Sequence, residues 1–205
     1  MLLIALGSIG LIISSVLYFH QSKPISIPKT YGVQIHSAPS SVKPSPKLIA
    51  SYSVPPTNPK YISIPSIGLT QARIVQLGLT GSNQVATPDN IYDTGWYNGS
   101  AKPGQSGAMF IYGHVSSWTA DGVFFNLKRL KVGENITITR GDNTTYTYQV
   151  VSSKIYPYNN VNMQEVLSPI NASKPGLNLM TCTGSLIKGT SEFSERLVVF
   201  TSLDR

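Results

Sequence analysis

The chain has 205 residues, and 16 lysines and arginines against 9 acidic residues give it a net charge of +7. Only 12% of the residues are charged, 41% are apolar, and there is one cysteine. This composition allows one domain with a real core and excludes a disulfide framework and a cysteine-rich zinc site. The basic excess lies mostly in residues 21–60, which hold five lysines and no acid. Because no basic cluster interleaves with aromatic residues, we expect no nucleic-acid partner.

The first segment, residues 1–19, contains no charged side chain. A helix of that length spans roughly 28 Å, close to the hydrocarbon core of a bilayer. We predict that residues 1–20 form a transmembrane anchor, with a cleaved signal segment or a buried helix of the domain as the alternatives. The flanking charges do not settle the orientation of this segment.

Residues 21–60 are rich in proline, serine and lysine and contain eight of the 14 prolines. Proline removes backbone donors that helices and sheets need. We therefore predict an extended, partly polyproline linker that acts as a spacer rather than as a lid.

Residues 61–205 change to short patterns typical of β-strands. Residues 134–140 and 144–156 alternate apolar and polar side chains on either side of a Gly-Asp-Asn turn, which predicts a hairpin. Further runs are apolar enough to be central strands, at residues 109–115, 177–182 and 196–203. Residues 122–130 and 161–169 are two candidates for short helices. The whole pattern indicates a mainly β domain, either a sandwich or a barrel.

Cys182 ends one of these predicted strands and is followed by a Thr-Gly breaker. A nucleophile suits that place because the strand fixes it and the loop leaves access. The alternative is a buried cysteine that packs as a small hydrophobe. His114 is the only histidine after residue 60. It is either a structural histidine or the group that accepts the proton of a cysteine nucleophile.

Arg196 begins the last predicted strand, shortly after two acidic residues, Glu192 and Glu195. One interpretation is a surface salt bridge that contributes little. The other is a fixed cation that stabilises an oxyanion or lowers the pKa of a thiol. In the second case, Arg196 and a protonated His114 would both favour the thiolate of Cys182.

The order of a histidine, an Asn-Leu-Met-Thr-Cys run at 178–182 and then an arginine resembles the sortase family of Gram-positive-type cell surfaces. Asn178 departs from that family's motif, which has threonine there. Residues 61–75 and 111–138 also resemble the family's first strand and its histidine region, so the resemblance covers residues 61–205. Among the classes of this family, the sequence pattern most resembles class F, with classes E and D as alternatives.

The resemblance implies a closed eight-stranded β-barrel with short helices, preceded by an N-terminal transmembrane helix. It implies that Cys182 attacks a C-terminal sorting signal of the Leu-Pro-x-Thr-Gly type and forms a thioester. His114 would act as general acid and base, Arg196 would bind substrate and stabilise the oxyanion, and Thr181 would lie at a substrate-binding position. The acceptor would be an amine of a cell-wall precursor or a pilin.

The same resemblance implies a single-pass membrane protein with its catalytic domain outside the cell. No acidic cluster indicates a metal site, so we predict activity without a metal or cofactor, and we expect a monomer. Three other readings stay open: a secreted cysteine peptidase with the same Cys-His pair, an L,D-transpeptidase whose Ser-His-Gly-Cys-type motif is missing here, and a non-enzymatic, wall-facing β-domain.

Overall fold

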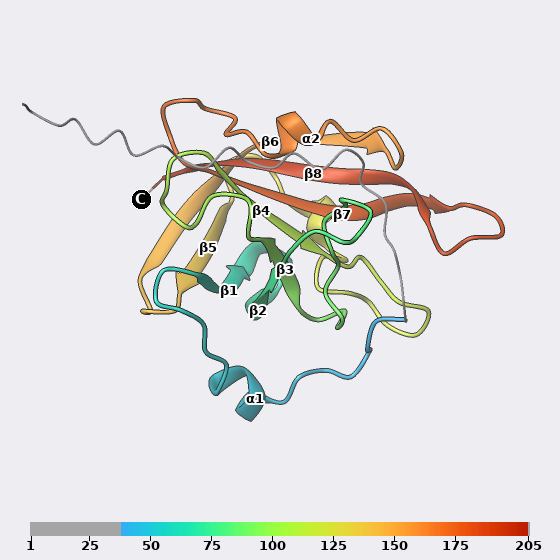
Figure 1. The fold of residues 1–205 in the computed structure, drawn as a ribbon, viewed down its shortest axis with the longest axis horizontal. Coiled ribbons are helices and arrows are strands. Elements are labelled where there is room, and N and C mark those ends of the chain that lie inside the picture. The colour runs from blue at the N-terminus through green and yellow to red at the C-terminus, as the bar shows by residue number, and fades with distance from the viewer. Residues whose placement is uncertain (1–37, 205) are drawn as a thin grey trace, which may run out of the picture.

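A computed structural model describes residues 38–204, and in it the β-strands close into a barrel in the order β1-β2-β3-β4-β7-β8-β6-β5 (Figure 1). The strands are β1 Pro59–Ile64, β2 Leu69–Leu77, β3 Thr94–Tyr97, β4 Ala108–Gly113, β5 Asn135–Arg140, β6 Thr145–Pro157, β7 Gly176–Leu186 and β8 Phe193–Leu203. Neighbours pair antiparallel, except that β2 lies parallel to β3 and β4 lies parallel to β7. The expected eight-stranded barrel is therefore confirmed.

The predicted strands are all present. The hairpin is β5 and β6, and β4, β7 and β8 contain the three apolar runs. Every residue of β4 is buried, as expected for a strand covered on both faces. The residues that alternate in the predicted hairpin, Ile136, Ile138 and Tyr148, point into the main core.

The two helical candidates form only single turns. Residues 122–130 contain the 3₁₀ turn η2, Leu127–Arg129, and residues 161–169 contain the helix α2, Met163–Val166. A further 3₁₀ turn, η1, spans Pro65–Ile67. Asn162 begins α2 by accepting a hydrogen bond from the Glu165 amide, and Pro169 follows soon after its end.

The predicted linker is only partly extended. Its residues 46–50 form the helix α1, Pro46–Ala50, with Ser45 as the N-cap and proline in the first turn. That position tolerates proline because its N–H would be unsatisfied anyway. The Tyr61 hydroxyl donates to the Ile49 carbonyl, and the Tyr52 hydroxyl donates to the Ile74 carbonyl at 2.7 Å. The end of the predicted linker is therefore attached to the barrel, and β1 already begins within it.

The predicted transmembrane anchor and residues 21–37 lie outside the described residues. Within residues 38–204, no helix has the length and apolar character needed to cross a membrane.

Two separate apolar clusters stabilise the barrel. The first draws buried residues from all eight strands and therefore fills the interior, with Ile111, Leu179 and Leu197 among its members. The second lies outside the barrel on β4, β7 and β8, and α2 covers it with Met163 and Val166. The three strands β4, β7 and β8 are therefore buried on both faces, and the site lies where the outer cluster ends.

Candidate active site

Strand register gathers the chemically active side chains on one outer face. In β4, Phe110 and Tyr112 belong to the outer cluster, and His114 follows them with the same parity. In β7 and β8, Cys182 and Arg196 stand directly opposite each other in the antiparallel register. Tyr112 pairs with Met180 in the parallel ladder of β4 and β7. His114 and Cys182 each follow two residues later, so they lie at the same level along the two chain segments. The barrel thus brings together the predicted cysteine, histidine and arginine.

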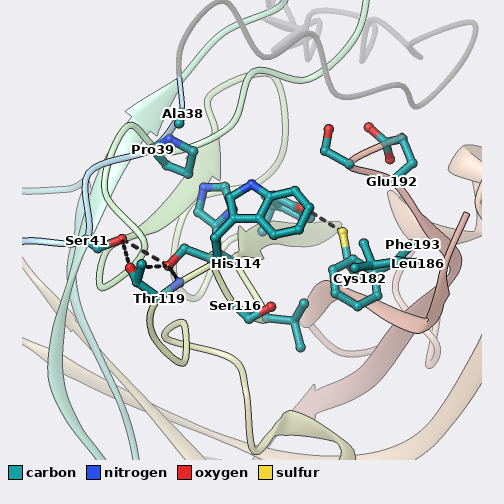
Figure 2. Close-up of a pocket in the computed structure, with 15 residues that line it drawn as sticks. Ala38, Pro39, Ser41, His114, Ser116, Thr119, Cys182, Leu186, Glu192 and Phe193 are labelled. Atoms are coloured by element: carbon teal, nitrogen blue, oxygen red, sulfur yellow. Dashed lines mark hydrogen bonds between the residues drawn. The ribbon is translucent and has the colours of Figure 1, made fainter. Parts of the chain in front are cut away.

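A cavity of about 530 Å³ opens at this end of the three strands. Cys182 and His114 both face it, from opposite sides in Figure 2. Glu192 borders it from the loop between β7 and β8, and Phe193 from the start of β8. Trp118, 78% exposed, borders it from the segment after His114. This combination of an apolar lining and a few polar groups is typical of a ligand site.

The sulfur of Cys182 lies 3.2 Å from the Tyr112 hydroxyl. Burial raises the pKa of the Cys182 thiol above its ordinary value, although the charge of Arg196 and the bond to Tyr112 act in the opposite direction. The carboxylate of Glu192 raises this pKa further. Arg196 thus favours the thiolate as expected, but burial outweighs it in the free protein, so the thiol form dominates at neutral pH.

His114 is 8% exposed and is held by the backbone around it. Its Nε2 lies 2.8 Å from the carbonyl oxygen of Pro88, and a carbonyl can only accept, so Nε2 donates. The His114 carbonyl accepts from the Phe124 amide, and a side chain on Gly122 would approach that carbonyl oxygen to 2.4 Å. Burial lowers the pKa of His114, so the ring is neutral at pH 7.

Arg196 is fully buried, which corrects the surface salt bridge that its neighbours in the sequence suggested. Its guanidinium forms an ion pair with Glu192 at 2.7 Å and donates to the carbonyls of Phe193 and Glu195. It also lies over the Tyr158 ring, 5.9 Å from the centroid. Arg196 itself does not line the cavity, whereas its partner Glu192 does. The charge of Arg196 therefore acts on Cys182 from a distance. Its partner, the Glu192 carboxylate, is the member of the ion pair that a bound substrate can contact.

Thr181 does not face the cavity. Its hydroxyl donates to the Gly113 carbonyl at 2.8 Å, and the residue is 2% exposed. Thr181 shares the parity of Leu177 and Leu179, which point into the barrel. The predicted substrate-binding position is thus corrected to a structural one, in which Thr181 ties β7 to β4 next to the cysteine and histidine.

Asn178, which departs from the family motif, attaches the helix α2 to the sheet. Its side-chain amide donates to the carbonyls of Val166 at 2.7 Å and Ser168 at 2.9 Å. Threonine has one donor and could not make both bonds. Asn178 therefore holds the segment that covers the outer cluster, and its side chain does not line the cavity.

Three features of the cavity were not predicted from the sequence. The segment 38–42 runs along one side, where Ala38, Pro39 and Ser41 line the cavity. It pairs with the loop that holds His114: the Ser40 amide donates to the Asp89 carbonyl, and the Ser40 carbonyl accepts from the Ile91 amide. Tyr112 and Glu192 are the other two features. Two of these features left a signal in the sequence: Tyr112 shares the parity of His114 on the same strand, and Glu192 lies close to Arg196 along the chain.

The fold and the cavity define a β-barrel protein that places a cysteine and a histidine at one site, a pairing suited to nucleophilic acyl transfer. The Sortase domain family matches residues 62–204. The chain therefore belongs to the sortase family, and it is a cysteine transpeptidase.

Solved structures agree with this assignment. A Clostridium perfringens sortase D5 transpeptidase is 24% identical with a TM-score of 0.51, over 71% of this chain and 78% of that one. Sortase A from Corynebacterium diphtheriae is 26% identical with a TM-score of 0.54, over 71% of this chain and 60% of that one. A pilus-related sortase C of group B Streptococcus is 25% identical with a TM-score of 0.55, over 75% and 70%.

No curated protein matches this chain in sequence. The similar structures belong to sortase classes A, C and D, so the nearness to class F stays a prediction.

Proposed function

We propose that this protein is a membrane-anchored sortase that cleaves a C-terminal sorting signal of the Leu-Pro-x-Thr-Gly type and transfers the protein to an amine of the cell wall or a pilin. The observation that carries the proposal is that one cavity is lined by both Cys182, within β7, and His114, directly after the neighbouring strand β4. The proposal assigns the chemistry to Cys182, His114 and Arg196.

Cys182 is the proposed nucleophile. Its sulfur attacks the scissile carbonyl, the C–N bond breaks, and the acyl group stays on the sulfur as a thioester. Because burial raises the pKa of this thiol, a base must take the proton as substrate binds. His114 is that base: with Nε2 donating to Pro88, Nδ1 is the ring nitrogen left to accept a proton.

His114 then returns the proton to the leaving amine, and in the second half-reaction it takes one from the incoming amine. The pKa of the ring is lowered by burial, which makes its protonated form a strong acid toward the leaving group. Arg196 supplies a fixed positive charge opposite Cys182 in the register and favours the negative charge that develops during attack. Substrate that displaces the Glu192 carboxylate would strengthen this effect.

Transfer to an amine, rather than to water, is a property of the sortase family. A pilus-related sortase C is among the similar structures, which supports a pilin as one class of acceptor. We place the catalytic domain outside the cell, held by residues 1–20, and we expect a monomer that needs no metal or cofactor. These parts of the proposal follow from the sequence pattern of the first segment and from the family.

The test is an analysis of products from the full chain in detergent, incubated with a pool of sorting-signal peptides with and without an added amine. The proposal predicts a new amide that joins the N-terminal part of one peptide to the amine, and no product with Cys182→Ala. A hydrolysed acid as the sole product in the presence of abundant amine would instead establish a cysteine peptidase. No product from folded protein with any peptide would contradict the proposal.

A further inference from the structure

A second polar group lies directly beside the sulfur of Cys182. The hydroxyl of Tyr112 is 3.2 Å from Sγ, and this contact is drawn as a dashed line in Figure 2. The Tyr112 ring also stands edge-on to the ring of His114, with 5.9 Å between the centroids and 69° between the planes. Tyr112 therefore touches both side chains to which the proposed function assigns the chemistry.

The strand register explains why a tyrosine reaches the cysteine. Tyr112 pairs with Met180 in the parallel ladder of β4 and β7, and Cys182 is the next residue along β7 on the same face. A long side chain spans this diagonal distance between neighbouring strands. The aromatic ring packs in the outer cluster while Tyr112 remains only 1% exposed, so its hydroxyl is presented to the sulfur from inside the protein.

The chemistry of the two groups sets the direction of the bond. A thiolate has no proton, so the phenol must be the donor when Cys182 is ionised. A hydrogen bond to an ionised group is stronger than a neutral one, and burial strengthens it further. The other charged or titratable groups around Cys182 are His114 across the cavity, Arg196 on β8 and Glu192 on the adjoining loop.

We propose that Tyr112 is a catalytic residue whose phenol donates a hydrogen bond to the Cys182 sulfur and stabilises the thiolate that attacks the substrate. The inference rests on the proposed function for the identity of the reaction. His114 takes the thiol proton, the sulfur forms its bond to the carbonyl carbon, and the leaving amine receives that proton from His114. Tyr112 keeps its own proton throughout and supplies only the hydrogen bond.

The test replaces Tyr112 by phenylalanine in the full chain, which removes one oxygen and keeps the ring against His114. The rate at which iodoacetamide alkylates Cys182 is followed by mass spectrometry from pH 6 to 11 (a range of about 5 pH units that covers ordinary thiol titration). We expect alkylation at pH 7 to slow by about tenfold and the profile to move to higher pH. Acyl transfer should lose a similar factor in kcat/KM.

Tyr156→Phe is the matched control. Tyr156 packs against the same outer cluster, but its hydroxyl donates to Glu165 at 2.7 Å and not to the sulfur. This variant should leave the alkylation profile unchanged. Thermal unfolding checks that both variants fold. If Tyr112→Phe does not fold, 3-fluorotyrosine at position 112, a stronger donor of the same shape, should move the profile to lower pH.

A Tyr112→Phe profile that overlays the wild-type profile would overturn the inference, and so would an equal shift in Tyr156→Phe. The alkylation readout needs no sorting signal. If no peptide reacts with the wild type, the proposed function fails while the role of Tyr112 is still decided by the alkylation rates.

Discussion

The strands β4, β7 and β8 have two faces that differ in composition and in what they do. Toward the barrel interior they present mostly apolar side chains to a cluster shared by all eight strands, among them Ile111, Leu179 and Val199. Toward the outside they begin with apolar residues such as Phe110 and Val198. Around the cavity, however, the outer face changes to polar and reactive groups, namely Tyr112, His114, Cys182 and Arg196.

The difference teaches how one sheet combines stability with reactivity. Side chains of a strand alternate between faces, so a residue can be reactive without interrupting the core on the other side. The inner face fixes the backbone of the strands, and the outer cluster under α2 fixes their side chains up to the edge of the cavity. Substitutions on the two faces should therefore separate into effects on folding and effects on chemistry.

The largest effect is expected on the outer face, from His114→Gln. Glutamine cannot take up and return a proton, and general acid–base catalysis contributes about 10²–10⁴-fold. We expect acyl transfer to fall by that factor, measured as kcat/KM with the productive sorting peptide, with the midpoint of thermal unfolding nearly unchanged. An activity within a few-fold of wild type would remove His114 from the proposed mechanism.

On the inner face of β7, Leu179→Ala should cost about 2–5 kcal/mol of unfolding free energy, because it leaves a cavity in the barrel. The measurement is denaturant unfolding. The pH profile of Cys182 alkylation should stay as in the wild type wherever the variant is folded. A large change in that profile would mean that the two faces are not separable.

Asn178→Thr tests the attachment of α2 to the outer face. The variant restores the residue of the family motif but loses at least one of the bonds to Val166 and Ser168, which we expect to cost about 1–3 kcal/mol of stability. Denaturant unfolding measures this loss, with the acylation rate recorded beside it. Equal or greater stability in the threonine variant would contradict the assigned role of these bonds.

The smallest effect concerns the ion pair at the cavity edge. The negative charge of Glu192 raises the pKa of the Cys182 thiol, so Glu192→Gln should lower that pKa. A lower thiol pKa means more thiolate at neutral pH, and alkylation of Cys182 should become about two- to fivefold faster. Glu195→Gln, which removes an equal charge three residues further on, is the control and should change the rate less.

The sequence allowed the barrel strands to be predicted because their apolar alternation and their turns are local signals. The reactive residues Cys182, His114 and Arg196 were found because their types and order are distinctive. The inward direction of Thr181 and the burial of Arg196 depend on which strands become neighbours, and no local pattern carries that information. The contact of Tyr112 with the sulfur depends on the parallel pairing of β4 with β7, which are far apart in the sequence.

The contacts that part of the predicted linker makes with the barrel were missed for a related reason. Proline density indicates an absence of regular structure, but it does not show that Tyr52 and Tyr61 bind residues 46–50 to the barrel or that Ser41 reaches the cavity. Those contacts depend on single side chains within the proline-rich segment, such as Tyr52, and on partners on the barrel such as the Ile74 carbonyl. Any shortened form of the protein should therefore keep residues 38–50 to preserve the cavity.

The most direct test of the account is the intact mass of the full chain after brief incubation with the productive sorting peptide, followed by peptide mapping and treatment with neutral hydroxylamine. The account predicts an added mass equal to the N-terminal part of the peptide, located on Cys182, absent in Cys182→Ala and released by hydroxylamine, as a thioester requires. Cleaved peptide without any adduct on Cys182, or an adduct on another residue, would contradict it.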